Sequence, residues 1–288
     1  MKNSGFIYLI FTILISSNFI SCGDETLSSA APEGNFTYPF KLTASWYYGT
    51  MNFLTNIRPD SIKNYFEPDT IEGYGGIIFL GDTVINNDTL RLMRNNHSDP
   101  QHIHSAVELY KQNSSGLYRH AYFSEAYTFT PYRHLGQKLK FRFNNKFYHS
   151  PNEIIYQLKN DIDFSLDNSD TVIYMDNPPL LALKYPVKKN DEWQLRDNGS
   201  FKIIKKYIDY ENISNVEKTY YCIKINKYYY FNNSSTPDTN ISYADYFSKE
   251  GIVKKDVSIR NIEVYNEHAV LIGYIDTNEE DILNIFSP

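Results

Sequence analysis

Apolar and polar positions alternate along most of the chain after residue 38, and this pattern predicts β-strands. Successive side chains of a strand point to opposite faces. In the segment 218–225, one face would carry Tyr221, Ile223 and Ile225, and the other would carry Cys222. Shorter runs of the same kind occur at 83–85 and 89–92. The pattern therefore predicts an all-β chain made mainly of antiparallel sheet.

One segment has helical spacing instead and predicts a short helix near 151–160. Ser150 is suited to cap the first turn, Pro151 to occupy the first helical position, and Glu153 to complete a capping box. Apolar residues then follow at helical spacing as far as Leu158. The polar, proline-containing stretch after this helix is suited to a boundary between two parts of the chain.

Two sequence landmarks indicate an internal duplication. Tyr38-Pro39-Phe40-Lys41 leads to Trp46, and Tyr185-Pro186-Val187-Lys188 leads to Trp193 at the same spacing. A second pair of segments, 108–119 and 244–254, has the same order of aromatic strand end, turn, glycine and aliphatic residues. We therefore expect two duplicated β-rich units, 38–150 and 181–288, joined by the helix and a linker at 151–180.

Three segments resemble a broad family of uncharacterised bacterial envelope lipoproteins. They are 185–193, 219–224 and 246–254, and the family pattern runs Y-P-L-x-x-G-N-x-W, then C-x-K in a strand, then Y-x-x-G-I-G-L-V-K. This chain departs from the pattern where Asn190-Asp191 replaces Gly-Asn before Trp193. The resemblance implies an antiparallel β fold and supplies no established activity or catalytic residue.

The amino-acid composition favours β-sheet and argues against nucleic acid as a binding partner. The 288 residues include 26 Tyr and 18 Phe, which favour strands, and the formal net charge is −6. Because the chain has no basic run, it lacks the electrostatic footprint of a nucleic-acid-binding protein, so no nucleic acid partner is expected. The second of the two cysteines, Cys222, is expected to be buried, unpaired and unreactive.

The N-terminus resembles the signal of a bacterial lipoprotein. Lys2 and the apolar run 6–15 precede Phe19-Ile20-Ser21-Cys22. The resemblance implies a signal peptide at 1–21, lipid on Cys22, and a flexible tether at 22–37 that holds the folded part near the membrane. Asp24 at the third mature position, rather than the second, favours the outer membrane by the same analogy. The alternative is a secreted protein with an unmodified Cys22.

Histidines gather in one place in the sequence. His97, His102 and His104 are the candidate metal ligands, because imidazole nitrogens bind zinc and two of these residues share a strand face. The polar sequence around them, 95–101, favours exposed loop histidines instead. No metal and no other cofactor is predicted, and zinc at these three residues is the alternative.

Candidate chemistry elsewhere is sparse, so the predicted function is non-enzymatic. The sequence contains no H-E-x-x-H, G-x-S-x-G, S-x-x-K, P-loop or G-x-G-x-x-G pattern. Asp161, with the other acidic residues of 161–170, is interpreted as solvated. We expect a membrane-anchored interaction or assembly module with an envelope protein or glycan as partner. The alternative is a glycan- or peptide-binding lipoprotein that stacks ligands on exposed Tyr228, Tyr229 and Tyr230.

Overall fold

The computed structural model describes residues 27–28, 36–42, 44–134, 136–162 and 173–287. Strands dominate this part of the chain, with one α-helix, α2 (Pro151–Lys159), and one 3-10 helix, η1 (Asp60–Phe66). The strands are β1 (Leu27–Ser28), β2 (Ser45–Arg58), β3 (Thr70–Ile85), β4 (Asp88–Ser98), β5 (His102–Asn113), β6 (Gly116–Phe129), β7 (Arg133–His134), β8 (Gln137–Lys138), β9 (Lys140–Phe143), β10 (Lys146–Tyr148), β11 (Ile173–Lys184), β12 (Glu192–Asp197), β13 (Phe201–Ser214), β14 (Thr219–Phe231), β15 (Ile241–Ser248), β16 (Gly251–Tyr265) and β17 (Leu271–Ser287).

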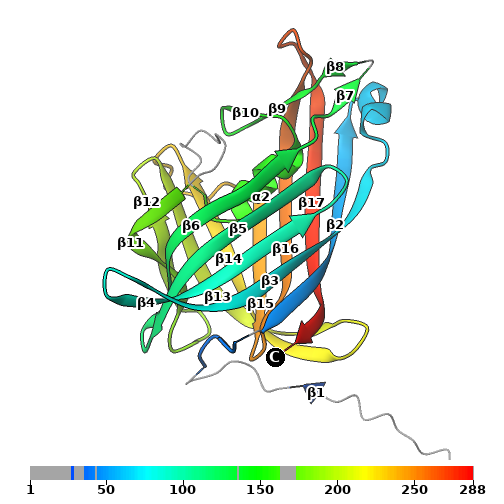
Figure 1. Ribbon diagram of the computed structural model, residues 1–288. Coiled ribbons are helices and arrows are strands. Elements are labelled where there is room, and N and C mark those ends of the chain that lie inside the picture. The colour runs from blue at the N-terminus through cyan, green and yellow to red at the C-terminus, as the bar shows by residue number, and fades with distance from the viewer. Residues whose placement is uncertain (1–26, 29–35, 43, 135, 163–172, 288) are drawn as a thin grey trace, which may run out of the picture.

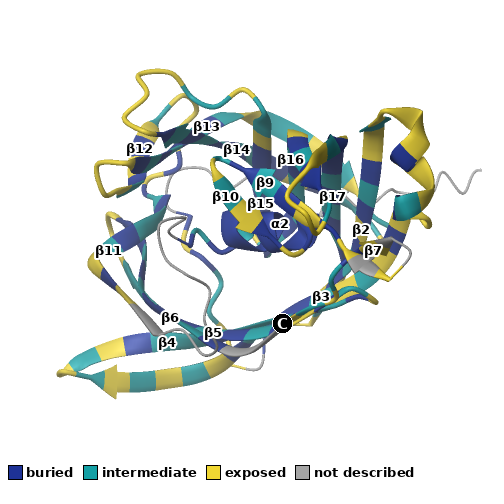
Figure 2. Cartoon of the chain, turned by 90° about the horizontal axis from the view of Figure 1, so that it is seen from above, coloured by how far each residue is buried: buried dark blue, intermediate teal, exposed yellow. Residues whose placement is uncertain are grey.

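The main sheet consists of two consecutive meanders. Its strand order is β11-β6-β5-β4-β3-β2-β17-β16-β15-β14-β13-β12, and each neighbouring pair is antiparallel. The first meander, β2 to β6 with β11, joins the second, β12 to β17, where β2 pairs with β17. The prediction of an all-β, mainly antiparallel fold is confirmed. Seen from above, the sheet curves almost into a closed ring with α2 inside it (Figures 1 and 2).

Side chains close the ring where its two end strands meet. β11 and β12 stand at opposite ends of the strand order, although they follow one another in the chain. The Trp193 indole donates to the Leu181 carbonyl at 2.8 Å, the Lys205 ammonium donates to the Ala182 carbonyl at 3.0 Å, and the Tyr207 hydroxyl donates to the Lys184 carbonyl at 2.6 Å. These donors satisfy backbone acceptors along β11 that an edge strand would otherwise present to other chains.

The predicted helix forms as its sequence indicates. The Ser150 hydroxyl accepts a hydrogen bond from the Glu153 amide at 3.3 Å, and the Glu153 carboxylate accepts one from the His149 amide at 2.7 Å. Its apolar residues Ile154, Ile155 and Leu158 are buried in a hydrophobic cluster with Phe141 and strand residues of the second meander. We call this cluster the helix-side cluster.

A second hydrophobic cluster, the tryptophan-side cluster, contains both tryptophans together with Tyr38, Tyr185 and Cys222. Cys222 is fully buried, as predicted, and burial raises the pKa of its thiol to about 12, which keeps it protonated. The backbone amide of Tyr38 donates to the Tyr185 hydroxyl at 2.9 Å, so the two Tyr-Pro landmarks are in direct contact.

The two landmark tryptophans occupy matching positions in the sheet. Trp46 is the second residue of β2, and Trp193 is the second residue of β12, so each lies at the start of the first strand of its meander. The segments 108–119 and 244–254 fall on the β5–β6 and β15–β16 hairpins. Both halves contribute to one sheet and to both clusters, and β9 of the first predicted unit pairs with β16 of the second. The duplication itself stays a prediction.

The hydrogen bond from Trp193 to β11 leads to a prediction about stability. We expect Trp193→Phe to lower the free energy of unfolding by about 1–3 kcal/mol, because the carbonyl of Leu181 loses its side-chain donor. Urea unfolding would measure the change. Tyr74→Phe, at a site that is 70% exposed, is the control and should change stability by less than about 0.5 kcal/mol. Equal effects of the two substitutions would contradict the proposed role of Trp193.

Candidate functional site

A layer of polar side chains lies inside the sheet, between the two hydrophobic clusters. On β13, for example, Ile203 belongs to the helix-side cluster and Tyr207 to the tryptophan-side cluster, with the buried Lys205 between them. The neighbouring strands repeat this arrangement at the same level. We call these inward-facing residues the polar belt: Thr50 and Asn52 on β2, Lys205 on β13, Lys227 on β14, Asp245 on β15, Lys255 on β16, and Glu279 and Asp281 on β17.

The first meander and α2 add further charges to the belt. Arg119 of β6 donates to Asp176 of β11 at 2.9 Å and to Glu108 of β5 at 3.4 Å, and it also donates to the Asn160 carbonyl at 2.6 Å. Burial alone would lower the pKa of the Arg119 guanidinium, but the two carboxylates raise it above its usual value. Arg119 therefore holds three separate elements together around one buried positive charge.

Lys159 plays a similar part at the end of α2. Its ammonium lies 2.5 Å from Glu279 and 2.6 Å from Asp281, both on β17. Burial opposes its charge, yet Asp281 and Glu279 raise the pKa of Lys159 above its usual range. The helix is thus tied to the sheet by ion pairs that are almost fully removed from solvent.

The lysines of the second meander are less completely paired. Lys227 lies 2.8 Å from Asp161 and 3.9 Å from Asp245, and Lys205 lies 3.7 Å from Asp245. Burial, and then the charge of Lys227, lower the pKa of Lys205 to about 8. Among the described residues, Lys255 has no hydrogen bond or ion pair; burial, and then the charge of Lys159, lower the pKa of its ammonium, while the charges of Asp245 and Asp281 oppose this. The buried Oδ1 atom of Asp245 has no hydrogen-bond donor among the described residues. The Lys255 ammonium and the Asp245 Oδ1 atom are therefore available to bind a ligand.

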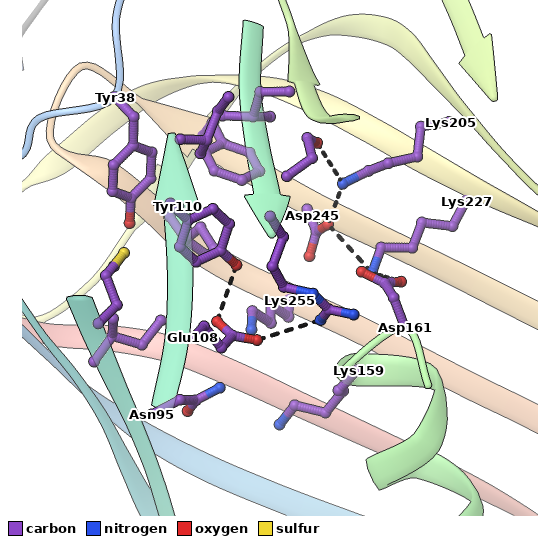
Figure 3. Close-up of a pocket in the computed structure, with 18 of the residues that line it drawn as sticks. Tyr38, Asn95, Glu108, Tyr110, Lys159, Asp161, Lys205, Lys227, Asp245 and Lys255 are labelled. Carbon is purple, nitrogen blue, oxygen red and sulfur yellow. Dashed lines mark hydrogen bonds and ion pairs between the residues drawn. The ribbon is translucent and has the colours of Figure 1, made fainter. Parts of the chain in front are cut away.

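These groups surround a cavity of about 80 Å³ (Figure 3). Tyr110 donates to the Glu108 carboxylate at 2.9 Å on one side of it, and the lysines of the second meander face it from the other side. A smaller cavity of about 20 Å³ shares Lys159 and Lys255 with the first. A polar space of this size holds several water molecules or a small polar ligand.

The predicted histidines lie together and are buried, so the interpretation of exposed loop histidines is wrong. His97 lies next to the last residue of β4, His102 begins β5, and His104 lies directly opposite His97 in the β4–β5 hairpin. His97 Nε2 lies 2.7 Å from Asp99 Oδ2, and His102 Nε2 lies 3.2 Å from His104 Nδ1. We call His97, Asp99, His102 and His104 the histidine cluster.

Aromatic side chains cover the histidine cluster. The ring of Phe129 stacks on His102 at 4.2 Å between centroids, and Tyr156 of α2 contacts His104 edge-on at 4.8 Å. Burial lowers the pKa of both His102 and His104 well below the usual range, so both rings are neutral. Among the described residues, His102 Nδ1 and His104 Nε2 have no partner, and leaving a buried polar atom unpaired costs about 1–3 kcal/mol.

The three candidate tyrosines do not form one exposed platform. Tyr229 is buried in the helix-side cluster and donates to the Leu158 carbonyl at 3.2 Å. Tyr228 and Tyr230 are half-buried on the opposite face of β14, where Lys202 lies over the ring of Tyr230 at 4.3 Å. Strand alternation separates these side chains, and the expectation of an exposed Tyr229 is corrected.

Other predicted residues fall in different places. Asp161 lines the larger cavity and pairs with Lys227, so it is not a solvated carboxylate. Residues 163–170 and the lipidation candidate Cys22 lie outside the described residues. Neither described helix has the length and apolar composition needed to cross a membrane.

Sequence reasoning missed the polar belt, although the sequence carries a signal for it. The inward face of β13 reads Phe201, Ile203, Lys205, Tyr207, so a single charge interrupts an apolar face. The same interruption recurs on the next three strands. A charge at a matching step of successive apolar faces indicates a buried charged layer, but strand register is needed to recognise it.

Comparisons with known proteins find similarity between this chain and solved structures at low sequence identity. No family model and no curated protein matches it. Among solved structures, it is similar to a candidate exported protein with a YmcC-like fold from Bacteroides fragilis, at 11% identity and a TM-score of 0.34, over 90% of this chain and 100% of the other. It is also similar to a candidate lipoprotein from Parabacteroides distasonis, at 10% identity and a TM-score of 0.33, over 88% of this chain and 100% of the other. Similarity this low carries no functional information.

The buried ion pairs make a second stability prediction. We expect Arg119→Met to lower the free energy of unfolding by about 3–5 kcal/mol, because Asp176 and Glu108 would be left buried without their shared cation. Arg91→Met is the matched control, since its ion pair with Asp82 is exposed and should contribute less than about 1 kcal/mol. Chemical denaturation of both variants would compare them, and similar losses would show that burial of the Arg119 network adds nothing.

Proposed function

We propose that this protein is a lipid-anchored component of the bacterial envelope that acts as a non-enzymatic interaction module. The N-terminal sequence supports the anchor, since an apolar run at 6–15 is followed by Phe19-Ile20-Ser21-Cys22. Several acyl chains on Cys22 would hold the protein firmly, whereas a single chain binds only marginally. Attachment to the outer membrane is part of the proposal, on the ground that Asp24 stands at the third mature position.

The module's binding site, in this proposal, is the cavity inside the polar belt, and its ligand is a small anion. The proposal rests on the difference between the cations of the polar belt that have ion-pair partners and the one that has none among the described residues. Arg119 and Lys159 have ion pairs with two carboxylates each, whereas Lys255 lines the cavity without an ion pair among the described residues, and only the more distant charges of Asp245 and Asp281 favour its charged form. A carboxylate, sulfate or phosphate group placed there would meet Lys255 together with the crowded Lys205 and Lys227. The free Oδ1 of Asp245 would accept a hydrogen bond from a donor on the same ligand.

Binding is favoured over catalysis because most charged groups of the belt are fixed by one another. Lys227 is held by Asp161, and Lys159 is held by two carboxylates of β17. Groups held this way orient a ligand and shield it from water, which is the role of polar groups in a binding pocket. An envelope protein or a glycan as a larger partner stays part of the proposal, with the exposed strand faces as its contact area.

The anchor proposal has a direct test. We expect wild-type protein to incorporate labelled palmitate and to sediment with membranes, and Cys22→Ala to lose both properties because the thioether cannot form. Cys222→Ala is the matched control, since its thiol is buried, and it should keep both. Labelled fatty acid or membrane association retained by Cys22→Ala would disprove the lipid anchor.

The ligand proposal predicts a pH dependence. Succinate and sulfate keep their charge above neutral pH, so calorimetric titrations with them report on the protein groups. We expect saturable binding of at least one of these anions that weakens as the pH rises through about 8, because Lys205 then loses its proton. Lys255→Met should weaken binding by about ten- to a hundredfold, as expected for one charged hydrogen bond.

Lys249→Met, at an exposed position, is the control for the ligand test and should bind as the wild type does. The small-anion proposal fails if neither succinate nor sulfate binds saturably. It also fails if Lys255→Met binds them as tightly as the control. These results would leave the anchor proposal untouched, because lipidation is measured separately.

A further inference from the structure

We propose that the histidine cluster is a zinc site in which His97, Asp99 and His102 bind Zn²⁺ and His104 supplies the fourth ligand. One ligand atom from each of His97, Asp99 and His102 lies within 4.8 Å of the other two. In a tetrahedral zinc site with bonds of 2.0–2.2 Å, neighbouring ligand atoms are roughly 3.3 Å apart. These three ligands therefore need to contract by about an ångström or less each to surround an ion, and His104 lies outside this group of three.

The fourth ligand follows from the contact between the two histidines of β5. His104 Nδ1 already lies 3.2 Å from His102 Nε2, close to the ligand separation of a tetrahedral site. Three imidazole nitrogens and one carboxylate oxygen are a donor set that zinc binds readily. No other group of at least three such side chains comes this close together among the described residues.

The shared hydrogen bond of these two rings leaves one buried donor and one buried acceptor without a partner among the described residues. Each neutral imidazole has one N–H and one lone pair. If His104 Nδ1 carries the proton and donates it to His102 Nε2, then His104 Nε2 keeps a buried lone pair and the N–H at His102 Nδ1 has no acceptor. If His102 gives the proton, the two roles are exchanged. In either arrangement one buried lone pair and one buried N–H remain unsatisfied among the described residues. An ion bound by His102 Nε2 and His104 Nδ1 would replace the shared hydrogen bond and take the lone pairs of both nitrogens, and the protons would then lie on His102 Nδ1 and His104 Nε2.

The carboxylate is held in place for this role. Asp99 Oδ1 accepts hydrogen bonds from the backbone amides of Gln101 and His102, both at 2.7 Å. Its other oxygen, Oδ2, is thereby directed at His97 Nε2. Hydrogen bonds of this kind orient the ligands of metal sites and are part of what makes them selective.

The rings must turn for an ion to bind. The planes of His97 and His104 differ by only 6°, and those of His97 and His102 by 29°, so their lone pairs lie in nearly parallel planes. Rotation about the bond between Cβ and the ring would bring the nitrogens toward one point. Phe129 and Tyr156 would then close the site against water, which is typical of a structural rather than a catalytic zinc site.

The test uses full-length protein without a histidine tag, stripped of metal with EDTA. We expect one Zn²⁺ per chain by calorimetry and elemental analysis, retained through gel filtration, and a rise in the melting temperature on adding zinc. Co²⁺ in the same site should give the strong visible absorption of tetrahedral cobalt. Wild-type protein that binds neither ion stoichiometrically would overturn the proposal, whatever the variants do.

Variants locate the site. His102→Ala and Asp99→Asn should each weaken zinc binding by at least about a hundredfold, and Asp99→Asn also keeps the shape of the side chain if the alanine variant fails to fold. The controls are His149→Ala and His268→Ala, whose side chains are 70% and 72% exposed and which should bind zinc as the wild type does. Stoichiometric zinc kept by both cluster variants, or lost in the controls, would also overturn the proposal. The result is independent of the lipid anchor and of anion binding, because none of these residues takes part in either.

Discussion

Charge buried between two apolar clusters is the constraint on which the rest of this structure depends. A charged side chain removed from water is tolerated only with partners nearby, and each charge of the belt constrains the element that supplies its partner. Lys159 fixes the end of α2 against β17, and Arg119 fixes β6 against β11 and against the residue that follows the helix. The position of the helix inside the ring is therefore set by electrostatics as well as by packing.

The two meanders contribute unequally to this layer. The second meander supplies three lysines and one aspartate at one level of four adjacent strands, β13 to β16. The first meander supplies Glu108 and Arg119 and, next to the smaller cavity, the histidines. If the two halves arose by duplication, their interiors have diverged in chemistry while the strand arrangement was kept.

Much of the fold could be predicted from the sequence, whereas little of the candidate site could. Alternation gave the strands, and Ser150 with Glu153 marked the helix, because both signals are local. The belt depends on register: Lys205 lies opposite Lys227, and Asp245 lies opposite Lys255. Pairing of this kind cannot be read from single strands. The histidines were interpreted as exposed because their neighbours in the sequence are polar, but Phe129 and Tyr156, which bury them, come from distant segments.

Lys205 is part of the polar belt and also makes one of the side-chain hydrogen bonds that close the ring. Its amine donates to the Ala182 carbonyl of β11 and also stands beside Asp245 in the cavity wall. A charged donor makes a hydrogen bond about twice as strong as a neutral one, so the protonation of this amine affects the closure as well as the cavity. The protonation state of Lys205 therefore links the cavity to the contact that closes the ring at β11. In the proposed anion site, an anion that stabilised the charge on Lys205 would also strengthen the hydrogen bond that Lys205 makes to β11.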